Sequence, residues 1–179
     1  IYRPVWMYIG KDDYVDFLLD EMGNHRMTTD SRNTKYGIWY NSKYGMMSKN
    51  DAFCAAGVSY TLEHTATTGI LNPYINVGAG ASDAKSKASQ GIGTWHDAND
   101  ATYQPKRGDI FYKAGDHTGI VLDSDDKYIY TIEANTSSDE GVSGSVNTRI
   151  RERSGSAPYI TSGGFYSPPV EFSNANDSS

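Results

Sequence analysis

The sequence of 179 residues contains a single cysteine, Cys54. One thiol excludes an intramolecular disulfide framework and any zinc site built from several thiolates. The sequence also lacks a run of about 18 apolar residues, so we expect no membrane-spanning helix. Lys and Arg number 16 against 22 Asp and Glu, the net charge is −6, and the basic residues form no dense stripe. A nucleic-acid-binding surface that depends on phosphate contacts is therefore not expected.

The composition is that of a folded domain. Apolar residues make up 37% of the chain and aromatic residues 12%, with 14 tyrosines among them. This is enough material for a hydrophobic core, and the length predicts one domain. We place this domain at residues 1–170 and interpret residues 171–179, which are polar and show no periodicity, as a tail or linker. Because the chain begins with Ile1, we expect it to be a piece of a longer protein.

Helices are predicted in the first half of the chain. Val15, Leu18, Leu19 and Met22 recur at helical spacing within residues 12–23. A second, buried helix is expected to begin near Asn50 or Asp51, either of which can cap it, and to continue to about residue 62. Gly57 within this helix suggests a close approach to a neighbouring backbone. A short polar helix is expected at about 82–90, whereas residues 33–40 are too rich in glycine and aromatics to assign.

Strands are predicted after Pro105. The segments rich in Ile, Val, Tyr and Thr are 109–113, 117–123, 127–133 and 145–151, with a short further strand around 164–166. A tight turn at 124–126 makes the second and third of these a hairpin. The sequence therefore predicts an α+β fold in which N-terminal helices pack against an antiparallel sheet.

Cys54, His117 and Glu133 suggest a catalytic site with a cysteine nucleophile. A nucleophilic thiol needs an environment that stabilises its anion, a base within hydrogen-bond reach, and a group that orients the base. Cys54 lies near the expected start of a helix, where unpaired N–H groups and the helix dipole favour an anion. His117 begins one strand of the hairpin and Glu133 ends the other. A turn centred at residue 125 places them directly opposite each other, with Cβ atoms about 5 Å apart. Asn135 lies two residues further on as an additional polar partner.

Each of these residues also has an ordinary structural interpretation. A lone cysteine in a helix of small apolar residues is more often part of the core than a nucleophile. A His–Glu pair on neighbouring strands is often a simple cross-strand contact. The conjunction of Cys54, His117 and Glu133 within one α+β domain favours catalysis.

Four ordered blocks of sequence resemble the CHAP family, the cysteine, histidine-dependent amidohydrolases/peptidases. They contain Cys54, the Pro105–Phe111 segment, His117 and Glu133. The blocks are Phe53-Cys54-Ala55-Ala56-Gly57-Val58-Ser59-Tyr60, Pro105-Lys106-Arg107-Gly108-Asp109-Ile110-Phe111, His117-Thr118-Gly119-Ile120-Val121 and Thr131-Ile132-Glu133-Ala134-Asn135-Thr136. Residues 34–40 and 163–168 resemble the segment before the family's cysteine and its closing strand. Phe53 and Ala134 depart from the family's usual residues at their positions, but neither change removes a functional group.

The resemblance implies a papain-like (NlpC-type) core and hydrolysis of an amide bond in the peptide part of peptidoglycan. The family occurs in phage endolysins and bacterial autolysins. It implies that Cys54 is the nucleophile, His117 the general base, Glu133 the orienting group and Asn135 an auxiliary polar residue. The expected partner is the bacterial cell wall, and the expected location is at the wall after secretion, or after release from a phage-infected cell at lysis. Because the chain is acidic, we expect a wall-binding domain or subunit outside this segment.

Aromatic and acidic residues outside these blocks leave alternatives open. Tyr36, Trp39, Tyr40 and Trp95 can line a groove for the substrate or fill a small core. Some relatives in the family bind calcium, and residues 97–100 and 123–126 are rich in Asp. Both segments lack the Gly and Glu of an EF-hand loop, so we interpret them as turns and predict no metal or cofactor. His25, His64 and His96 lack a partner at informative spacing.

Two further functions compete with a wall hydrolase. One is a papain-like protease or amidase that acts on a substrate outside the wall, such as a toxin effector. The other is a catalytically inactive module that binds wall peptide. The sequence does not indicate whether the bond cleaved is muramoyl–L-alanine or a peptide bond.

Overall fold

The computed structural model describes residues 14–24, 30–49, 51–65, 70–137 and 144–170. In these residues the chain is an α+β protein, with four α-helices, one 3₁₀ helix and a six-stranded antiparallel sheet. The helices are α1 (Tyr14–Asp20), η3 (Ser31–Asn33), α2 (Lys35–Tyr44), α3 (Cys54–Glu63) and α4 (Val77–Ser89). The strands are β1 (Thr94–Asp97), β2 (Ile110–Lys113), β3 (His117–Ser124), β4 (Tyr128–Thr136), β5 (Ser145–Glu152) and β6 (Gly163–Ser167). No helix in the described ranges is long and apolar enough to cross a membrane.

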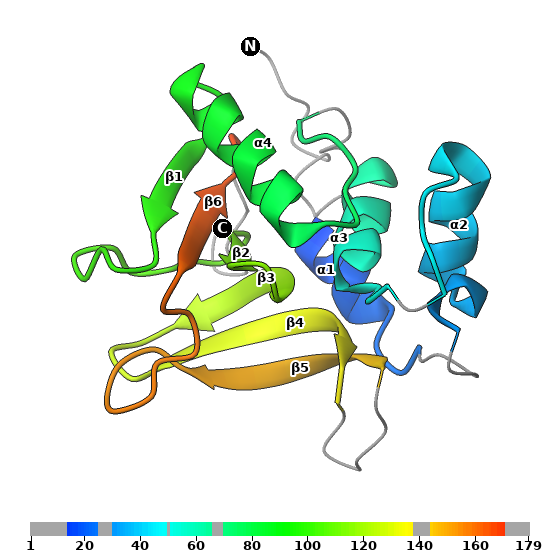
Figure 1. Cartoon of the computed structure of the whole chain (residues 1–179). Helices are drawn as coiled ribbons and strands as arrows, with labels where there is room; N and C mark the ends of the chain where they lie inside the picture. Colours follow the sequence, from blue (N-terminus) through cyan, green and yellow to red (C-terminus); the bar gives the residue numbers. More distant parts are fainter. Residues whose placement is uncertain (1–13, 25–29, 50, 66–69, 138–143, 171–179) are drawn as a thin grey trace, which may run out of the picture.

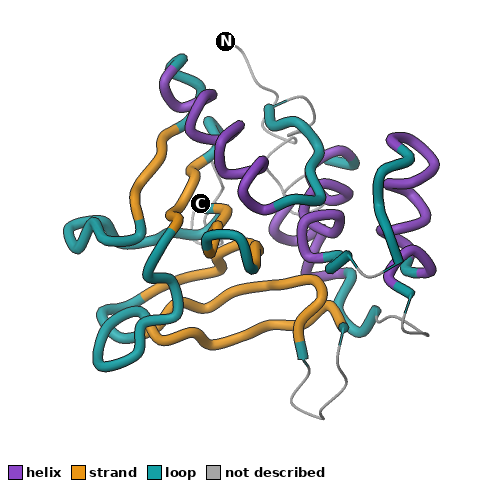
Figure 2. Tube along the Cα trace, viewed as in Figure 1, coloured by secondary structure: helices purple, strands orange, loops and turns teal. Residues whose placement is uncertain are grey.

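The strand order of the sheet is β1-β6-β2-β3-β4-β5. β6, the last strand of the described chain, pairs between β1 and β2 and is therefore an internal strand of the sheet. The sheet is strongly twisted: β1 and β6 run steeply in Figure 1, whereas β4 and β5 lie nearly across the view. The helices gather on one side of this sheet (Figure 2).

The main core lies between the helices and the sheet. α3 packs on β3 and β4, α1 on β4 and β5, and α4 on β1, β2 and β6. The close approach expected at Gly57 is present, because a Cβ atom there would lie 2.4 Å from the Cβ of Ala134. Glycine therefore lets α3 lie against β4.

A smaller apolar cluster covers the opposite face of the sheet. It contains Phe111, Val121, Ile129, Ile160 and Phe165, all less than 10% exposed. Ile160 comes from the segment between β5 and β6 rather than from a strand. The central strands are therefore buried on both faces, which explains their nearly continuous apolar sequence.

The predicted strands are confirmed with shifts of at most three residues at their ends, whereas several helix boundaries differ. The predicted start of the second helix at Asn50 or Asp51 was wrong, because α3 begins at Cys54 with Phe53 at its N-cap. Asn50 itself lies outside the described residues. The polar helix is longer than predicted and begins at Val77, where the side chain of Asn76 caps it. The sequence did not predict α2 or β1, and of the first predicted helix the structure describes residues 14–23.

The predicted hairpin register was also wrong, by two residues. Ile120 pairs with Ile132, which extends to Gly119 opposite Glu133. The turn is longer than predicted because Asp125 accepts hydrogen bonds from the N–H groups of Lys127 and Tyr128. A bulge between Val121 and Asp123 then compensates for part of this shift. Because the net shift is even, His117 and Glu133 still project from the same face of the sheet.

Candidate active site

Cys54 is the first residue of α3. The N–H groups of a helix's first turn have no partner within the helix, and the dipole places partial positive charge there. The N-cap residue, Phe53, has a side chain without a hydrogen-bond acceptor, and its ring is buried against Tyr36 at 5.8 Å between centroids. The N-cap side chain therefore accepts no hydrogen bond from the free N–H groups near the thiol. Cys54 is 2% exposed.

His117 is the first residue of β3, an internal strand of the sheet on which α3 packs. Its Nε2 lies 2.7 Å from Oε1 of Glu133, and the Cys54 thiol lies near enough to the ring to raise its pKa. Because Nε2 faces the carboxylate, Nδ1 is the ring nitrogen available to the thiol. The imidazole thus links Cys54 of α3 to Glu133 of β4, which is the order that nucleophile, base and orienting group require.

Glu133 reaches His117 diagonally across the hairpin rather than from the directly opposite position. Gly119 makes this possible, because a Cβ atom there would lie 2.9 Å from Cγ of Glu133. The glycine next but one to His117 therefore leaves the space that the carboxylate side chain occupies. Glu133 is 0% exposed, and its Oε2 accepts a hydrogen bond of 2.5 Å from Thr131.

The electrostatics favour a charged pair. Burial lowers the pKa of His117, but hydrogen bonds and charge interactions with Cys54 and Glu133 outweigh it and raise that pKa to about 9. Burial raises the pKa of Glu133, but His117 and Arg151 outweigh it and lower that pKa to about 2. At neutral pH the site therefore holds an imidazolium beside a carboxylate.

Arg151 is the residue of this site that the sequence analysis missed. It extends from β5 and donates to both oxygens of Glu133, from Nε to Oε2 at 2.9 Å and from Nη2 to Oε1 at 2.5 Å. The β4–β5 register places Arg151 opposite Ile129, four residues from Glu133. No local spacing predicts this contact, because it depends on the length of the arginine side chain and the twist of the sheet.

Asn135 lies beside His117 at the end of β4. Its φ of 54° makes it the only non-glycine residue with positive φ in the described ranges. Asn tolerates this conformation better than most residues. It coincides with a bulge, since the β4–β5 register shifts between Glu133 and Thr136. The bulge turns the backbone so that Asn135 and Thr136 both line the same hollow as His117.

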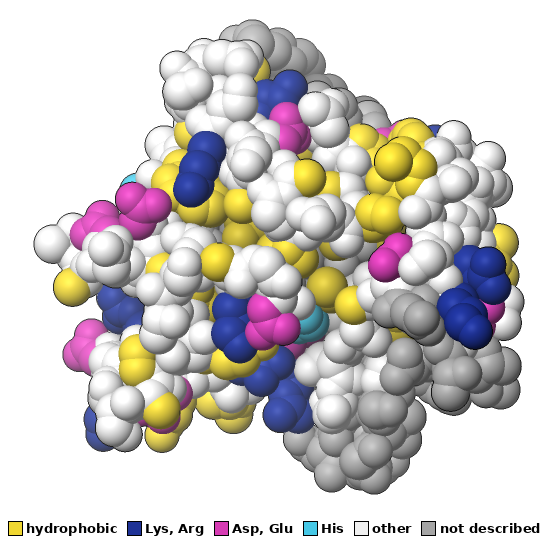
Figure 3. Space-filling view, viewed as in Figure 1, with side chains coloured by type: hydrophobic (Ala, Val, Ile, Leu, Met, Phe, Trp, Pro, Cys, Tyr) yellow, Lys and Arg dark blue, Asp and Glu magenta, His cyan; other side chains and the backbone are white. Residues whose placement is uncertain are grey.

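This hollow has a volume of about 440 Å³ and is open to solvent on one side. Its lining is mostly polar: Ala52, Asp116, His117, Asn135, Thr136, Ser137, Gly144, Arg149, Arg151 and Tyr159. Figure 3 shows basic side chains gathered on this face next to an acidic side chain and a histidine. His117 lines this hollow, whereas Cys54 is buried and is not one of the lining residues.

The four aromatic residues considered for substrate binding do not lie together. Tyr36 is 1% exposed and Tyr40 is 5% exposed, so both belong to the hydrophobic core. Trp39 is partly buried and packs edge-on against Tyr60. Trp95 belongs to β1, packs against a tyrosine of β2 and donates from Nε1 to Asp97. None of the four lines the hollow at His117 among the described residues.

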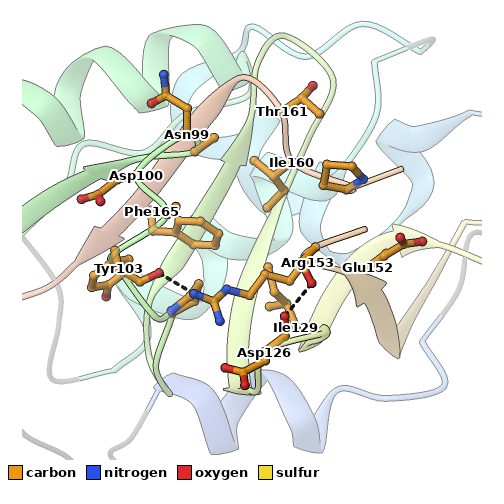
Figure 4. A pocket seen from close by; sticks show the side chains of 15 residues that line it. Asn99, Asp100, Tyr103, Asp126, Ile129, Glu152, Arg153, Ile160, Thr161 and Phe165 are labelled. Atoms are coloured by element: carbon orange, nitrogen blue, oxygen red, sulfur yellow. Dashed lines mark hydrogen bonds between the residues drawn. The ribbon is translucent and has the colours of Figure 1, made fainter. Parts of the chain in front are cut away.

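A second hollow, of about 540 Å³, lies over the smaller apolar cluster. Figure 4 shows its floor of Ile129, Ile160 and Phe165, with the guanidinium of Arg153 extended toward Tyr103. Arg153 donates to the carbonyl oxygens of Tyr103 and Asp125. This hollow shares no lining residue with the one at His117 in the described ranges, and no nucleophile–base pair lines it there.

The other histidines have structural surroundings. His64 follows α3 and its Nδ1 lies 2.7 Å from the carbonyl oxygen of Tyr60. His96 stacks on Tyr103 with centroids 3.5 Å apart. His25 lies outside the described residues. Asp97 and Asp100 form a turn, and in the described part of the chain no three His, Cys, Asp or Glu side chains form a group that could hold a metal.

Comparison of the chain with protein-family models, with curated protein sequences and with solved structures found no match.

Proposed function

We propose that this protein is a cysteine-dependent amidohydrolase of the CHAP type, with a papain-like arrangement of its core. The observation that carries the proposal is the arrangement of three residues: Cys54 at the start of α3 influences the pKa of His117, and His117 is hydrogen-bonded to Glu133 and lines an open hollow. The packing of α3 on β3 and β4 brings the three residues together from distant parts of the chain. An ordinary cross-strand contact accounts for the pair His117 and Glu133. It does not account for the thiol of Cys54, which comes from a helix that packs on the same two strands.

The reaction proceeds through an acyl-enzyme. The Cys54 thiolate attacks the carbonyl carbon of an amide while main-chain N–H groups at the start of α3 stabilise the oxyanion. The C–N bond breaks as His117 transfers its Nδ1 proton to the leaving amine. A water molecule then attacks the thioester, gives its proton to His117, and the C–S bond breaks to release the carboxylate product and the thiol side chain. Glu133 stabilises the imidazolium and fixes the tautomer.

The resemblance stated above favours wall peptide as the substrate, because the ordered sequence blocks surround the same residues that the fold assembles. The location and partner follow from this substrate: the bacterial cell wall, reached after secretion or lysis, with a wall-binding domain or subunit elsewhere. The polar hollow fits a peptide with several amides and carboxylates better than an apolar substrate. A protease acting outside the wall remains the second candidate, since the same geometry cleaves any accessible amide.

The test is digestion of purified peptidoglycan from several bacteria, followed by mass analysis of the fragments. We expect new amino groups without new reducing sugar ends, and we expect Cys54→Ala to abolish them while its thermal unfolding stays cooperative. The masses identify whether a muramoyl–L-alanine or a peptide bond is cut. Equal release by the Cys54→Ala variant would refute the proposed nucleophile. Turnover of a general peptide substrate without wall cleavage would favour the second candidate.

A further inference from the structure

Glu133 is surrounded by hydrogen-bond donors from three strands. Oε1 accepts from Nε2 of His117 and from Nη2 of Arg151, and Oε2 accepts from Nε of Arg151 and from Oγ1 of Thr131. The two bonds from Arg151 form a bidentate pair, the geometry that most restricts a carboxylate. Each carboxylate oxygen thus has two donors, and Arg151 is the one residue that contacts both oxygens.

Arg151 is itself held in place. Its guanidinium carbon lies 4.0 Å from the centroid of the Tyr159 ring, and Nη2 lies 3.5 Å from Oγ1 of Thr136. The main-chain N–H of Tyr159 donates to the carbonyl of Glu152, which ties the stacking ring to the end of β5. The side chain of Arg151 is 18% exposed. It therefore holds both oxygens of Glu133 and shares Oε1 with His117.

The proposed catalytic cycle changes the charge of His117, and this explains why Glu133 needs a second cation. In the proposed reaction His117 is charged when it faces the thiolate and neutral after it has protonated the leaving amine. A buried carboxylate with only a neutral imidazole beside it tends to take up a proton, because burial disfavours the charged form. The guanidinium does not lose its proton in this pH range, so its charge stays next to Glu133 at every step.

The geometry points to Arg151 as a positioning residue that keeps Glu133 ionised and fixed in orientation while His117 gains and loses its proton. This inference rests on the proposed function, since it concerns the same His117. Arg151 also lines the hollow at His117, but the role inferred here acts through Glu133 and requires no contact with Cys54. A Glu133 held in this way keeps Nε2–H of the imidazole directed inward, and Nδ1 stays directed to the thiol.

Other charged and titratable groups surround the carboxylate and must be kept constant in a test. They are Cys54 from α3, His117 from β3, Lys113 from the end of β2, Asp116 from the β2–β3 turn, and Tyr159 from the segment after β5. Arg153 provides a matched control arginine. It follows the last residue of β5 and donates to the carbonyl oxygens of Tyr103 and Asp125 instead of to a carboxylate.

The experiment replaces Arg151 by Met, which preserves length without charge, and by Lys, which preserves charge without the bidentate pair. Arg153→Met is the control. Carbon NMR of the Glu133 carboxyl, recorded in a Cys54→Ala background, gives its pKa without any catalysis. Turnover of each variant with Cys54 intact is measured from pH 4 to pH 10.

We expect Arg151→Met to raise the pKa of Glu133 by at least about one unit and to move the acid limb of turnover to higher pH. We expect turnover of Arg151→Met at neutral pH to fall by on the order of tenfold or more. Arg151→Lys should recover part of this loss. Arg153→Met should leave the acid and alkaline limbs of the pH profile at their wild-type positions. If Arg151→Met, or Arg151→Lys should the first not fold, keeps the wild-type carboxyl pKa and pH limbs, Arg151 has only a structural role. Loss of the proposed function would instead show as absent Cys54-dependent turnover in the wild type, whatever the carboxyl NMR gives.

Discussion

Glu133 and Asp109 are two buried carboxylates whose neighbours differ in charge. Glu133 lies between the imidazole of His117 and the guanidinium of Arg151, and its pKa falls to about 2. Asp109 is 1% exposed, but its donors are neutral: the hydroxyls of Tyr103 and Ser167 and the main-chain N–H of Lys106. Burial therefore outweighs these bonds and raises the pKa of Asp109.

The comparison separates a carboxylate with charged partners, to which we assign a role in the proposed reaction, from one with neutral partners, which joins two segments of the fold. Asp109 joins the segment before β2 to β6 through Ser167, and a proton on it would preserve hydrogen bonds in this place. Glu133 must stay charged to stabilise an imidazolium, and the fold supplies two cations for it. Burial alone does not make a carboxylate functional; the charge of its partners decides.

The largest expected effect comes from removing the charge of Glu133. We expect Glu133→Gln to lower wall-hydrolysing turnover by about 100-fold or more, because the imidazolium loses its stabilising anion. The matched change, Asp109→Asn, should leave turnover of the folded fraction within a few-fold of wild type. Initial rates of both purified variants measure this. Equal losses in the two variants would remove the distinction between the carboxylates.

A second prediction concerns the proton on His117. Because Glu133 contributes to the raised pKa of His117, about 9, we expect Glu133→Gln to lower that pKa toward its ordinary value of about 6.5. Histidine-selective NMR titration of wild type, Glu133→Gln and Asp109→Asn measures the shift. Asp109→Asn should not move it. A titration near 9 in all three proteins would show that the carboxylate does not hold the imidazolium.

A third prediction concerns stability at alkaline pH. The raised pKa of His117 means that its contribution to the free energy of unfolding is complete below about pH 6.5 and is lost as pH rises through about 9. We therefore expect the denaturation midpoint of wild type to fall over this window and that of His117→Gln to fall less. Urea unfolding at pH 6, 8 and 10 measures it, and parallel curves would contradict the assignment.

The smallest expected effects oppose each other at acid pH. The lowered pKa of Glu133 gives stability that is present above about pH 4.5 and lost as pH falls toward 2, whereas Asp109, with a raised pKa, gains relative stability on protonation. We expect Glu133→Gln to flatten the acid decline of the unfolding midpoint and Asp109→Asn to steepen it. Thermal melts between pH 7 and pH 3 measure both slopes. If both variants change the slope in the same direction relative to wild type, the contrast is refuted.

Much of the fold was predictable because the second half of the chain has a simple pattern. The runs of Ile, Val, Tyr and Thr between turns located β2 to β6 to within a few residues. Residues 33–40 were harder, because Gly37 and several aromatics obscure a helix whose start depends on the Thr34 cap. β1 could not be predicted, since Thr94–Asp97 becomes a strand only by pairing with β6 at the far end of the chain.

The candidate site was predictable in its members more than in its geometry. Cys54, His117 and Glu133 were identified from residue type and position. The expected direct pairing of the last two was wrong, because the Asp125 turn is longer and the bulge after Val121 changes the register. Arg151 was missed because its contact with Glu133 crosses strands at a four-residue offset.

The measurement that tests the account most directly is the rate at which iodoacetamide alkylates Cys54 at pH 5.5, in wild type and in His117→Ala. A thiolate stabilised by an imidazolium reacts at this pH, whereas an ordinary thiol with a pKa of about 8.5 is almost entirely protonated. We predict rapid alkylation of the folded wild type and a rate at least about tenfold lower in His117→Ala. A wild-type thiol that stays unmodified until the protein unfolds, or that reacts equally fast without His117, would contradict the central claim.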